Sequence, residues 1–270
     1  MSGRRVAALI RKELREFRMN PSALTPLGVI LFMTIFLPLL LLVIIPKVTN
    51  ERLSDDEEIR ELVEMLAKTQ PAIADLPVEA AAQAFMLQQF LFFFLLGPTI
   101  GAVALAAYSV VGEKQQKTLE PLLTTPLRTS ELLVAKAFAS LLPALVVEAL
   151  GVGIFMTLVA ALGAPGVARS LLNLKTALLL GVVGPLAALT AMQMAIAISS
   201  RASDPRSAQQ ISVVVVLPVV ALLVGQITGA FVIGTGLLML AAAVLLIVWV
   251  LVARLSVAVF DRETILTRWK

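Results

Sequence analysis

The sequence predicts an all-α polytopic membrane protein with six transmembrane helices. Of its 270 residues, 59% are hydrophobic, whereas soluble domains are about 45–50% apolar. The mean hydropathy is +0.95. The apolar residues form long stretches, and about 20 helical residues are enough to cross the ~30 Å core of a bilayer. The six predicted spans are 27–46, 86–111, 137–162, 173–199, 208–226 and 229–253.

Residues 1–26 precede the first span and predict a cytosolic amphipathic helix that ends at Asn20-Pro21. Such a helix lies in the interface plane with its basic face toward anionic lipid headgroups. Two roles are open: an anchor that only orients the first span, or a lever that links a cytosolic partner to that span. The apolar residues that recur at three- and four-residue steps are Val6, Leu9, Ile10, Leu14 and Phe17.

The acidic segment 47–85 is a predicted external insertion, since Pro46 ends the first predicted span. It carries nine acidic residues against four basic ones. Ser54 and Glu57 fit a capping box, and Pro77 suits the first turn of a helix that continues into the second span. Roughly 40 residues are too few for an independent core, so we expect a small helical cap packed on the membrane part. Its acidity either forms a solvated surface or gathers cations.

Small residues and prolines mark several spans. Gly97 and Gly101 form a G-x-x-x-G pattern in the second span, where backbones can approach closely. This pattern indicates packing within the bundle, a dimer seam or the wall of a pathway. A proline inside a helix removes a backbone hydrogen bond and permits a kink. The prolines inside predicted spans are Pro38, Pro143, Pro185 and Pro218.

The polar segment 112–136 joins the second and third spans. Thr118 is a good N-cap, and Pro126 disfavours helix at the residue before it. These rules predict a short helix at about 119–124, followed by a new helix that leads back into the membrane. The short helix exposes leucines that either need a partner to cover them or fold back on the bilayer interface. These leucines are Leu119, Leu122 and Leu123.

The distribution of Lys and Arg predicts the orientation of the spans. One side of the membrane holds 16 of these residues and the other side holds 6. Basic residues are in excess in cytoplasmic loops, so both termini and the segment 112–136 are predicted to be cytosolic. The segments on the basic side are 1–26, 112–136, 200–207 and 254–270.

The composition excludes several kinds of chemistry. The chain has no cysteine and no histidine, so disulfides, zinc sites with these ligands and Ser-His nucleophiles are excluded. No glycine is followed by lysine, so the chain has no phosphate loop of the G-x-x-x-x-G-K-S/T type. We therefore expect no catalytic centre and no cofactor or metal of its own. The net charge of +4 fits membrane-flanking anchors better than nucleic-acid binding.

Glu148 is the one charged residue deep within a predicted span. A carboxylate there costs ~2.5–3.5 kcal/mol on insertion scales unless it is paired or protonated. One interpretation is a functional group that meets a cation or a polar substrate. The other is a protonated side chain hydrogen-bonded to a neighbouring helix, with Gln193 of the fourth span as a candidate partner.

One long motif links the chain to a known family. The pattern E-K-x-x-x-T-L-E-P-L-L-x-S/T-P-L-x-x-x-E-L-L-x-x-K runs from Glu113 to Lys136 and resembles the cytosolic loop of ABC permeases of the second exporter class. The N-terminal run Arg11-Lys12-Glu13-Leu14-Arg15 and the ending Phe260-Asp261-Arg262-Glu263 are similar to the same family. The acidic insertion resembles the sodium- and drug-efflux branch. Lys117 departs from the pattern, because members often have glycine there.

The resemblance implies a half-transporter in a prokaryotic plasma (inner) membrane. Two permease chains would pair with two ATPase subunits, which would bind ATP and Mg. The helix 119–124 would be the coupling helix, and closure of the ATPases would push it to drive alternating access. The residues that the resemblance assigns to coupling are Glu113, Lys117, Thr118, Leu119, Glu120, Leu122 and Leu123.

Two further classes of function stay open at this stage. An ion-coupled secondary transporter would use Glu148, and a membrane scaffold or sensor would dock a different cytosolic protein on the segment 112–136. The sequence leaves the cargo open among sodium, a hydrophobic drug, a peptide and a lipid. An outward direction of transport rests on the resemblance alone.

Overall fold

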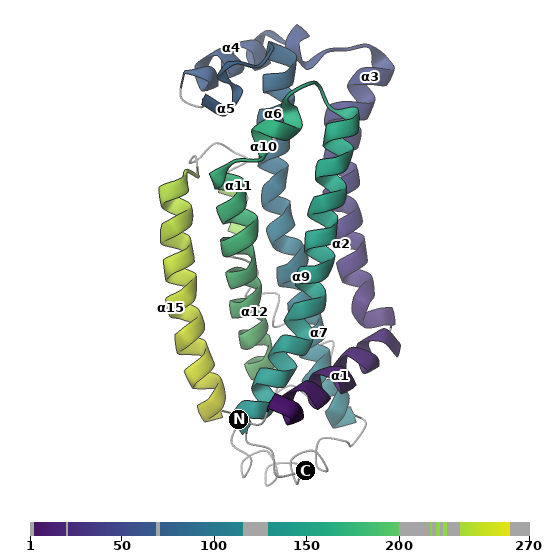
Figure 1. Ribbon diagram of the computed structural model, residues 1–270, viewed down its shortest axis with the longest axis vertical. Helices are drawn as coiled ribbons and strands as arrows, with labels where there is room; N and C mark the ends of the chain where they lie inside the picture. The colour runs from purple at the N-terminus through teal and green to yellow at the C-terminus, as the bar shows by residue number, and fades with distance from the viewer. Residues whose placement is uncertain are drawn as a thin grey trace.

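The structure is a computed structural model of the chain, and long helices stand side by side in it with short helices across one end (Figure 1). Every regular element among the described residues is helical, which confirms the all-α prediction. The described residues are 3–19, 21–68, 71–115, 129–199 and 233–259, with Leu217, Val220, Ala221, Val224 and Gly225.

Five helical stretches of the described chain are long and apolar enough to cross a bilayer. Four predicted spans overlap the first four of them, and the last predicted span overlaps the fifth. The predicted span 208–226 lies almost entirely outside the described residues. The five stretches are Leu27–Thr49, Val78–Ala107, Val134–Leu162, Leu174–Ile198 and Thr235–Ser256.

Several of these spans join helical segments of different type end to end. The first and fourth contain π-helical turns, the second contains a 3-10 turn, and the third and fifth are α-helical throughout. In chain order the segments are α2 (Pro21–Leu39), η1 (Leu40–Ile44), α3 (Ile45–Thr49), α6 (Val78–Phe90), η3 (Leu91–Leu95), α7 (Leu96–Gln115), α9 (Thr129–Leu162), α11 (Leu174–Leu178), η4 (Leu179–Val183), α12 (Gly184–Ser199) and α15 (Thr235–Val259).

The N-terminal helix α1 (Gly3–Met19) lies obliquely across one end of the bundle (Figure 1). It ends just before Pro21, where α2 begins, and this confirms the predicted break at Asn20-Pro21. Proline is tolerated in the first turn of a helix because its missing N–H has no partner there. Leu9 packs against the core cluster at this end, so protein covers part of the apolar face that the sequence assigned to the bilayer interface.

The first span continues through Pro46, where the sequence predicted an end. The π turn η1 precedes this proline, and the Ile45 N–H bonds to the Leu40 carbonyl. The π turn η4 stands at the same spacing before Pro185, with the Gly184 N–H bonded to the Leu179 carbonyl. A proline ring crowds the carbonyl four residues before it, and the wider turn makes room for the ring. The helix therefore passes both prolines.

Pro38, Pro143 and Pro218 are the other prolines at which the sequence predicted that a kink is permitted. Pro143 lies inside α9 and Pro38 inside α2, and both helices are α-helical at these residues. Pro218 falls outside the described residues. Among the predicted positions a π turn therefore precedes Pro185, and kinks at these prolines stay predictions.

A small helical cap covers the end of the bundle opposite α1, named the outer end because it is the predicted external side (Figure 1). Asp56 caps the main cap helix by accepting hydrogen bonds from the Glu58 and Ile59 N–H groups. The predicted capping box was therefore placed wrongly at Ser54, because the Ser54 N–H donates to Glu79 Oε2 at 2.9 Å instead. The cap consists of η2 (Leu53–Asp55), α4 (Glu57–Ala67) and α5 (Pro71–Ala74).

Two side-chain contacts fasten this outer end. The side-chain oxygen of Gln83 accepts a 3.0 Å hydrogen bond from the Ala164 N–H, and the Lys47 ammonium group donates to the Leu162 carbonyl at the end of α9. Gly166 has φ +91 in the turn that follows, before α10 (Val167–Leu171). The predicted turn at Pro165-Gly166 is thus confirmed, and glycine suits this left-handed backbone conformation.

The spans differ sharply in how much of their surface the protein covers. In the most apolar part of each span, 78% of the second and 61% of the fourth is buried, against 22% of the third and 6% of the last. The second and fourth spans therefore form the centre. The third span, which carries Glu148, has one face inward and one face outward.

Candidate functional site

Glu148 lies at the midpoint of the third span, 14 residues from either end of Val134–Leu162. At 1.5 Å per residue, each half is about 21 Å long. The side chain is 8% exposed, and its Oε1 atom is buried with no hydrogen-bond partner. The structure therefore places a buried, partly unsatisfied carboxyl group where the hydrocarbon core of a bilayer would be deepest.

The glycine pattern of the second span explains how this carboxyl group fits. A Cβ atom added to Gly97 would lie 2.8 Å from Glu148 Oε2. A Cβ added to Gly101 would overlap Leu27 and lie 3.6 Å from the Ala144 Cβ. Of the three predicted roles for this pattern, the structure shows packing within the chain, because α7 meets α9 and α2 along it.

The backbone beside Gly97 is irregular. The 3-10 turn η3 occupies five residues just before α7, and such turns rarely exceed three or four residues except at hinges or strained sites. Pro98 follows Gly97 and has no N–H to give to the Phe94 carbonyl. The Thr99 hydroxyl donates to the Leu95 carbonyl at 2.6 Å. The stretch beside Glu148 is thus a part of the second span where the α-helical hydrogen-bond pattern is interrupted.

Gln193 does not act as the hydrogen-bond partner that the sequence suggested for Glu148. It lies on α12 and is 7% exposed. The hydrogen bonds of the described residues include none between these two side chains. Gln193 remains a buried polar group of the central helix, and Glu148 faces Gly97 of α7 instead.

A buried ion pair joins α1 to the start of α9. Lys136 Nζ lies 3.0 Å from Glu13 Oε1, and the two side chains are each 1% exposed. The Glu13 Oε2 atom is buried without a hydrogen-bond partner. Sequence reasoning placed both residues inside family-like motifs but did not pair them, since they are 123 positions apart. The usable signal was an acidic residue inside the basic run Arg11-Lys12-Glu13-Leu14-Arg15.

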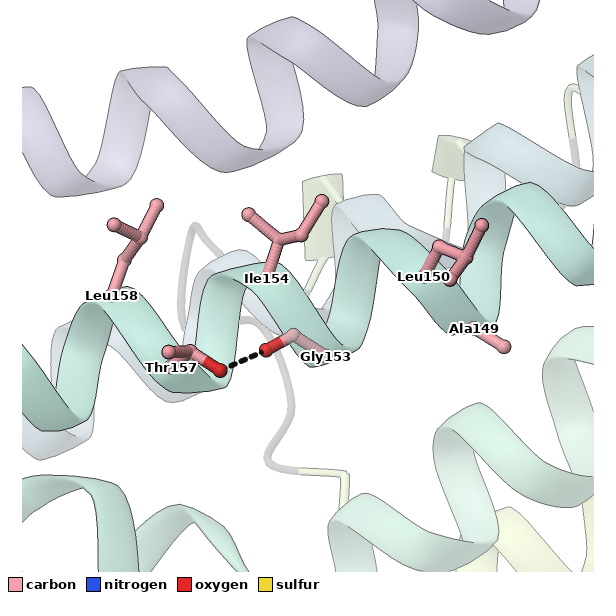
Figure 2. Close-up of a pocket in the computed structure, with 6 residues that line it drawn as sticks. All are labelled: Ala149, Leu150, Gly153, Ile154, Thr157 and Leu158. Atoms are coloured by element: carbon pink, nitrogen blue, oxygen red, sulfur yellow. Dashed lines mark hydrogen bonds between the residues drawn. The ribbon is translucent and has the colours of Figure 1, made fainter.

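A shallow hollow of about 430 Å³ lies on the exposed face of α9 (Figure 2). All six lining residues belong to this one helix, and Leu150, Ile154 and Leu158 project in the same direction (Figure 2). The Thr157 hydroxyl donates to the Gly153 carbonyl at 2.7 Å. The hollow therefore offers a surface for apolar contact and no uncommitted side-chain polar group.

No group of three or more acidic residues in the described part of the chain is placed to hold a metal ion. The buried charged residues of this part are Glu148 in the middle of the membrane region, Glu131 near the start of α9, and the Glu13–Lys136 pair at the end where α1 lies.

The family model described as "ABC-2 family transporter protein" matches residues 7–240, which is most of the chain. The chain belongs to the ABC-2 transporter family. It is a multi-pass membrane protein and a permease component of an ABC transporter, and the family is one of membrane transport components rather than of catalysts. No curated protein matches the chain.

The coupling residues predicted for this ABC-2 permease lie mostly outside the described residues. Glu113 belongs to the last turn of α7. The predicted coupling helix 119–124 and the other six coupling residues fall between Gln115 and Thr129, so the structure describes only the two helices on either side of them.

Proposed function

We propose that this ABC-2 permease is the membrane half of an ATP-driven exporter assembled from two permease chains and two ATPase subunits. Family membership and the missing phosphate loop support a division of labour in which another chain hydrolyses ATP. The observation that carries the proposal is the buried Glu13–Lys136 ion pair. It joins α1 to α9 at Lys136, the last residue of the predicted coupling segment 112–136.

The contacts of the described helices suggest how a push on the coupling segment would spread. The segment connects α7 with α9, so a displacement reaches both helices at once. Through Glu13 and Lys136 a movement of α9 also reaches α1. Helix α1 leads straight into α2 at Pro21, and α2, α7 and α9 meet around Gly101. This supports the lever role of the N-terminal helix over the simple anchor.

The topology we propose has six spans with both termini in the cytosol of a prokaryotic inner membrane. Leu238 of α15 and Leu179 of η4 share a core cluster, and the Thr190 hydroxyl lies 3.4 Å from the Leu245 carbonyl oxygen. The fourth span and α15 therefore run in the same direction. A chain that crosses twice in one direction crosses back in between, which supports the predicted span 208–226.

The branch and the cargo are proposed from the acidic cap, the hollow on α9 and Glu148. The acidic cap is typical of the sodium- and drug-efflux branch that the sequence resembles, and outward transport follows from that resemblance. The hollow on α9 is apolar, and Glu148 adds one anionic group. Together they favour a cation or a cationic amphiphile over a peptide or an anionic lipid.

Co-purification with a candidate ATPase, followed by ATP hydrolysis in liposomes, tests the exporter proposal. We expect Leu122→Asp with Leu123→Asp to abolish complex assembly or substrate-stimulated hydrolysis, because charged side chains do not fit an apolar groove. Leu172→Asp is the matched control, since Leu172 is 72% exposed in the turn between α10 and α11 at the outer end. Normal assembly and stimulation in the double variant would overturn the proposal.

The position of Glu148 also supports a second candidate, an ion-coupled secondary transporter. Carboxyl groups at the bilayer midplane mark ion and proton pathways in such proteins. Uptake or efflux driven by an imposed ion gradient, without ATPase or ATP, would favour this candidate. Transport that requires both ATPase and ATP favours the exporter.

A further inference from the structure

We propose that the Glu148 carboxyl group and the irregular backbone beside it, where η3 meets α7, bind a monovalent cationic group in the middle of the membrane region. This inference deepens the exporter proposal, because it gives the class of cargo. The positive charge could belong to an inorganic ion such as Na⁺ or to the ammonium group of an amphiphile. Both sources meet the same carboxyl group, and the experiment below separates them.

The first support is the missing partner of the carboxyl group. Glu148 is 92% buried, its Oε1 atom lacks a hydrogen-bond partner, and the salt bridges of the described residues leave it out. Buried polar groups in native proteins are almost always hydrogen-bonded, and each exception needs an explanation. A cation that binds during transport provides one, because it neutralises the carboxylate that the protein itself leaves uncompensated.

The second support is the cradle that positions the group. Glu148 Oε2 occupies space that any side chain at position 97 would fill, since a Cβ there would lie only 2.8 Å away. On the same two helices the ring of Phe94 packs against that of Phe155, with centroids 5.3 Å apart. The carboxyl group is thus held beside the backbone of α7, between aromatic contacts on its outer side and Gly101 on its inner side.

The third support is the oxygen atoms that this backbone can supply. Pro98 cannot donate to the Phe94 carbonyl in the α-helical manner, and the 3-10 turn η3 ends next to it. Interrupted helices in membrane proteins use such carbonyl groups to coordinate small cations. A carboxylate and carbonyl oxygens are the ligands that hard cations prefer. The glycine, the proline and the carboxyl group therefore combine into a site that none of them makes alone.

Binding to the full-length chain in lipid nanodiscs tests the site with two probes. Na⁺ is titrated against N-methyl-D-glucamine with melting temperature as the readout, and rhodamine 6G is followed by fluorescence anisotropy. We expect saturable binding of at least one probe, and Glu148→Gln should weaken it about tenfold or more. Glu61→Gln, which removes an exposed carboxylate from the cap, should change nothing.

A second variant guards against an effect on folding alone. Gly97→Ala keeps the carboxylate but fills its space, so we expect weaker binding at a melting temperature close to that of the wild type. Binding of Na⁺ identifies an inorganic ion, and binding of the dye alone identifies an organic cation. If neither probe binds the wild type, or if the probes bind Glu148→Gln as well as the wild type, the proposed site is overturned.

The outcome is independent of the exporter proposal, because binding is measured without the ATPase. A chain that binds cations through Glu148 but assembles with no ATPase would overturn the exporter and leave the site. An exporter whose binding and transport are unchanged by Glu148→Gln would overturn the site and leave the exporter.

Discussion

Two buried ionisable residues of α9, Lys136 and Glu148, stand in opposite situations. Lys136 lies near the start of the helix, and its ammonium group is 3.0 Å from Glu13 Oε1. Glu148 lies at the midpoint of the span, and its Oε1 atom has no partner. Both side chains are almost wholly buried. The same helix therefore carries one buried ionisable group with an ion-pair partner and another whose Oε1 atom has no hydrogen-bond partner.

This difference separates a structural role from a ligand-binding role. A buried charge with a partner is costly to disturb, because removal of either member leaves the other uncompensated. A buried charge without a partner destabilises the resting fold, and its retention is better explained by a ligand that it meets later. Replacing the two residues by the same apolar side chain should therefore change stability in opposite directions.

The largest effect is expected for Lys136→Met. This change leaves the buried Glu13 carboxylate with the more distant and more exposed Lys12 ammonium group, 3.7 Å from its Oε1 atom. Breaking a buried pair by removing one partner typically costs about 3–5 kcal/mol of unfolding free energy. Unfolding by SDS titration of the purified chain measures it. The double variant Glu13→Leu with Lys136→Met should recover most of the loss. If Lys136→Met is as stable as the wild type, the ion pair contributes nothing to the free energy of unfolding.

Glu148→Met should stabilise the chain by about 1–3 kcal/mol, since it removes an uncompensated polar group from the centre of the membrane region. The same SDS titration gives the sign directly. A clear loss of stability would mean that Glu148 has a partner that holds the helices together, and the contrast with Lys136 would fail.

Gln83→Met tests a neutral buried group at the outer end. The change leaves the Ala164 N–H without its 3.0 Å acceptor, and an unsatisfied buried donor costs about 1–3 kcal/mol. Hydrogen–deuterium exchange should rise in the turn after α9 and stay unchanged at α1. Equal exchange at both ends would show that the cap is not fastened there.

The smallest effect on stability is expected for Gly97→Ala. The added methyl group displaces the Glu148 carboxyl, but alanine favours helix over glycine by about 0.5–1 kcal/mol, so the net change should stay within about 1 kcal/mol. When Gly97→Ala is combined with Glu148→Ala, no carboxyl group is left for the added methyl group to displace. The double variant should therefore be at least as stable as Glu148→Ala alone. A large loss in both backgrounds would place another group in the cradle.

The sequence predicted the helical class and the five spans that the structure describes, because long apolar runs specify them locally. It also predicted the break at Pro21 and the turn at Gly166, since both depend on the backbone chemistry of one or two residues. It misplaced the helix cap of the external segment. Asp56 and Ser54 are both good capping residues, and the structure shows the helix starting directly after Asp56, with Ser54 in the preceding turn η2.

The candidate site was predictable only in part. Glu148 and Gly97 each stood out alone, as a charge and as a small residue within spans. Their contact depends on how α7 and α9 align, which no single span reveals. The Glu13–Lys136 pair was missed for the same reason, and the bond to Gln193 was wrong because helix order along the chain does not fix which faces meet.

The π turns before Pro46 and Pro185 have a consequence for comparing related chains. Such a turn holds one residue more than an α-helical turn would, and one residue corresponds to a rotation of about 100°. The apolar face of each span is therefore offset on the two sides of its π turn. Consider a relative with another residue in place of the proline and one residue fewer in the π turn. Its span would be α-helical throughout and would bury the same faces on both sides of the former turn. In an alignment, a single-residue gap at Leu40–Ile44 or Leu179–Val183 would therefore mark conserved packing rather than divergence.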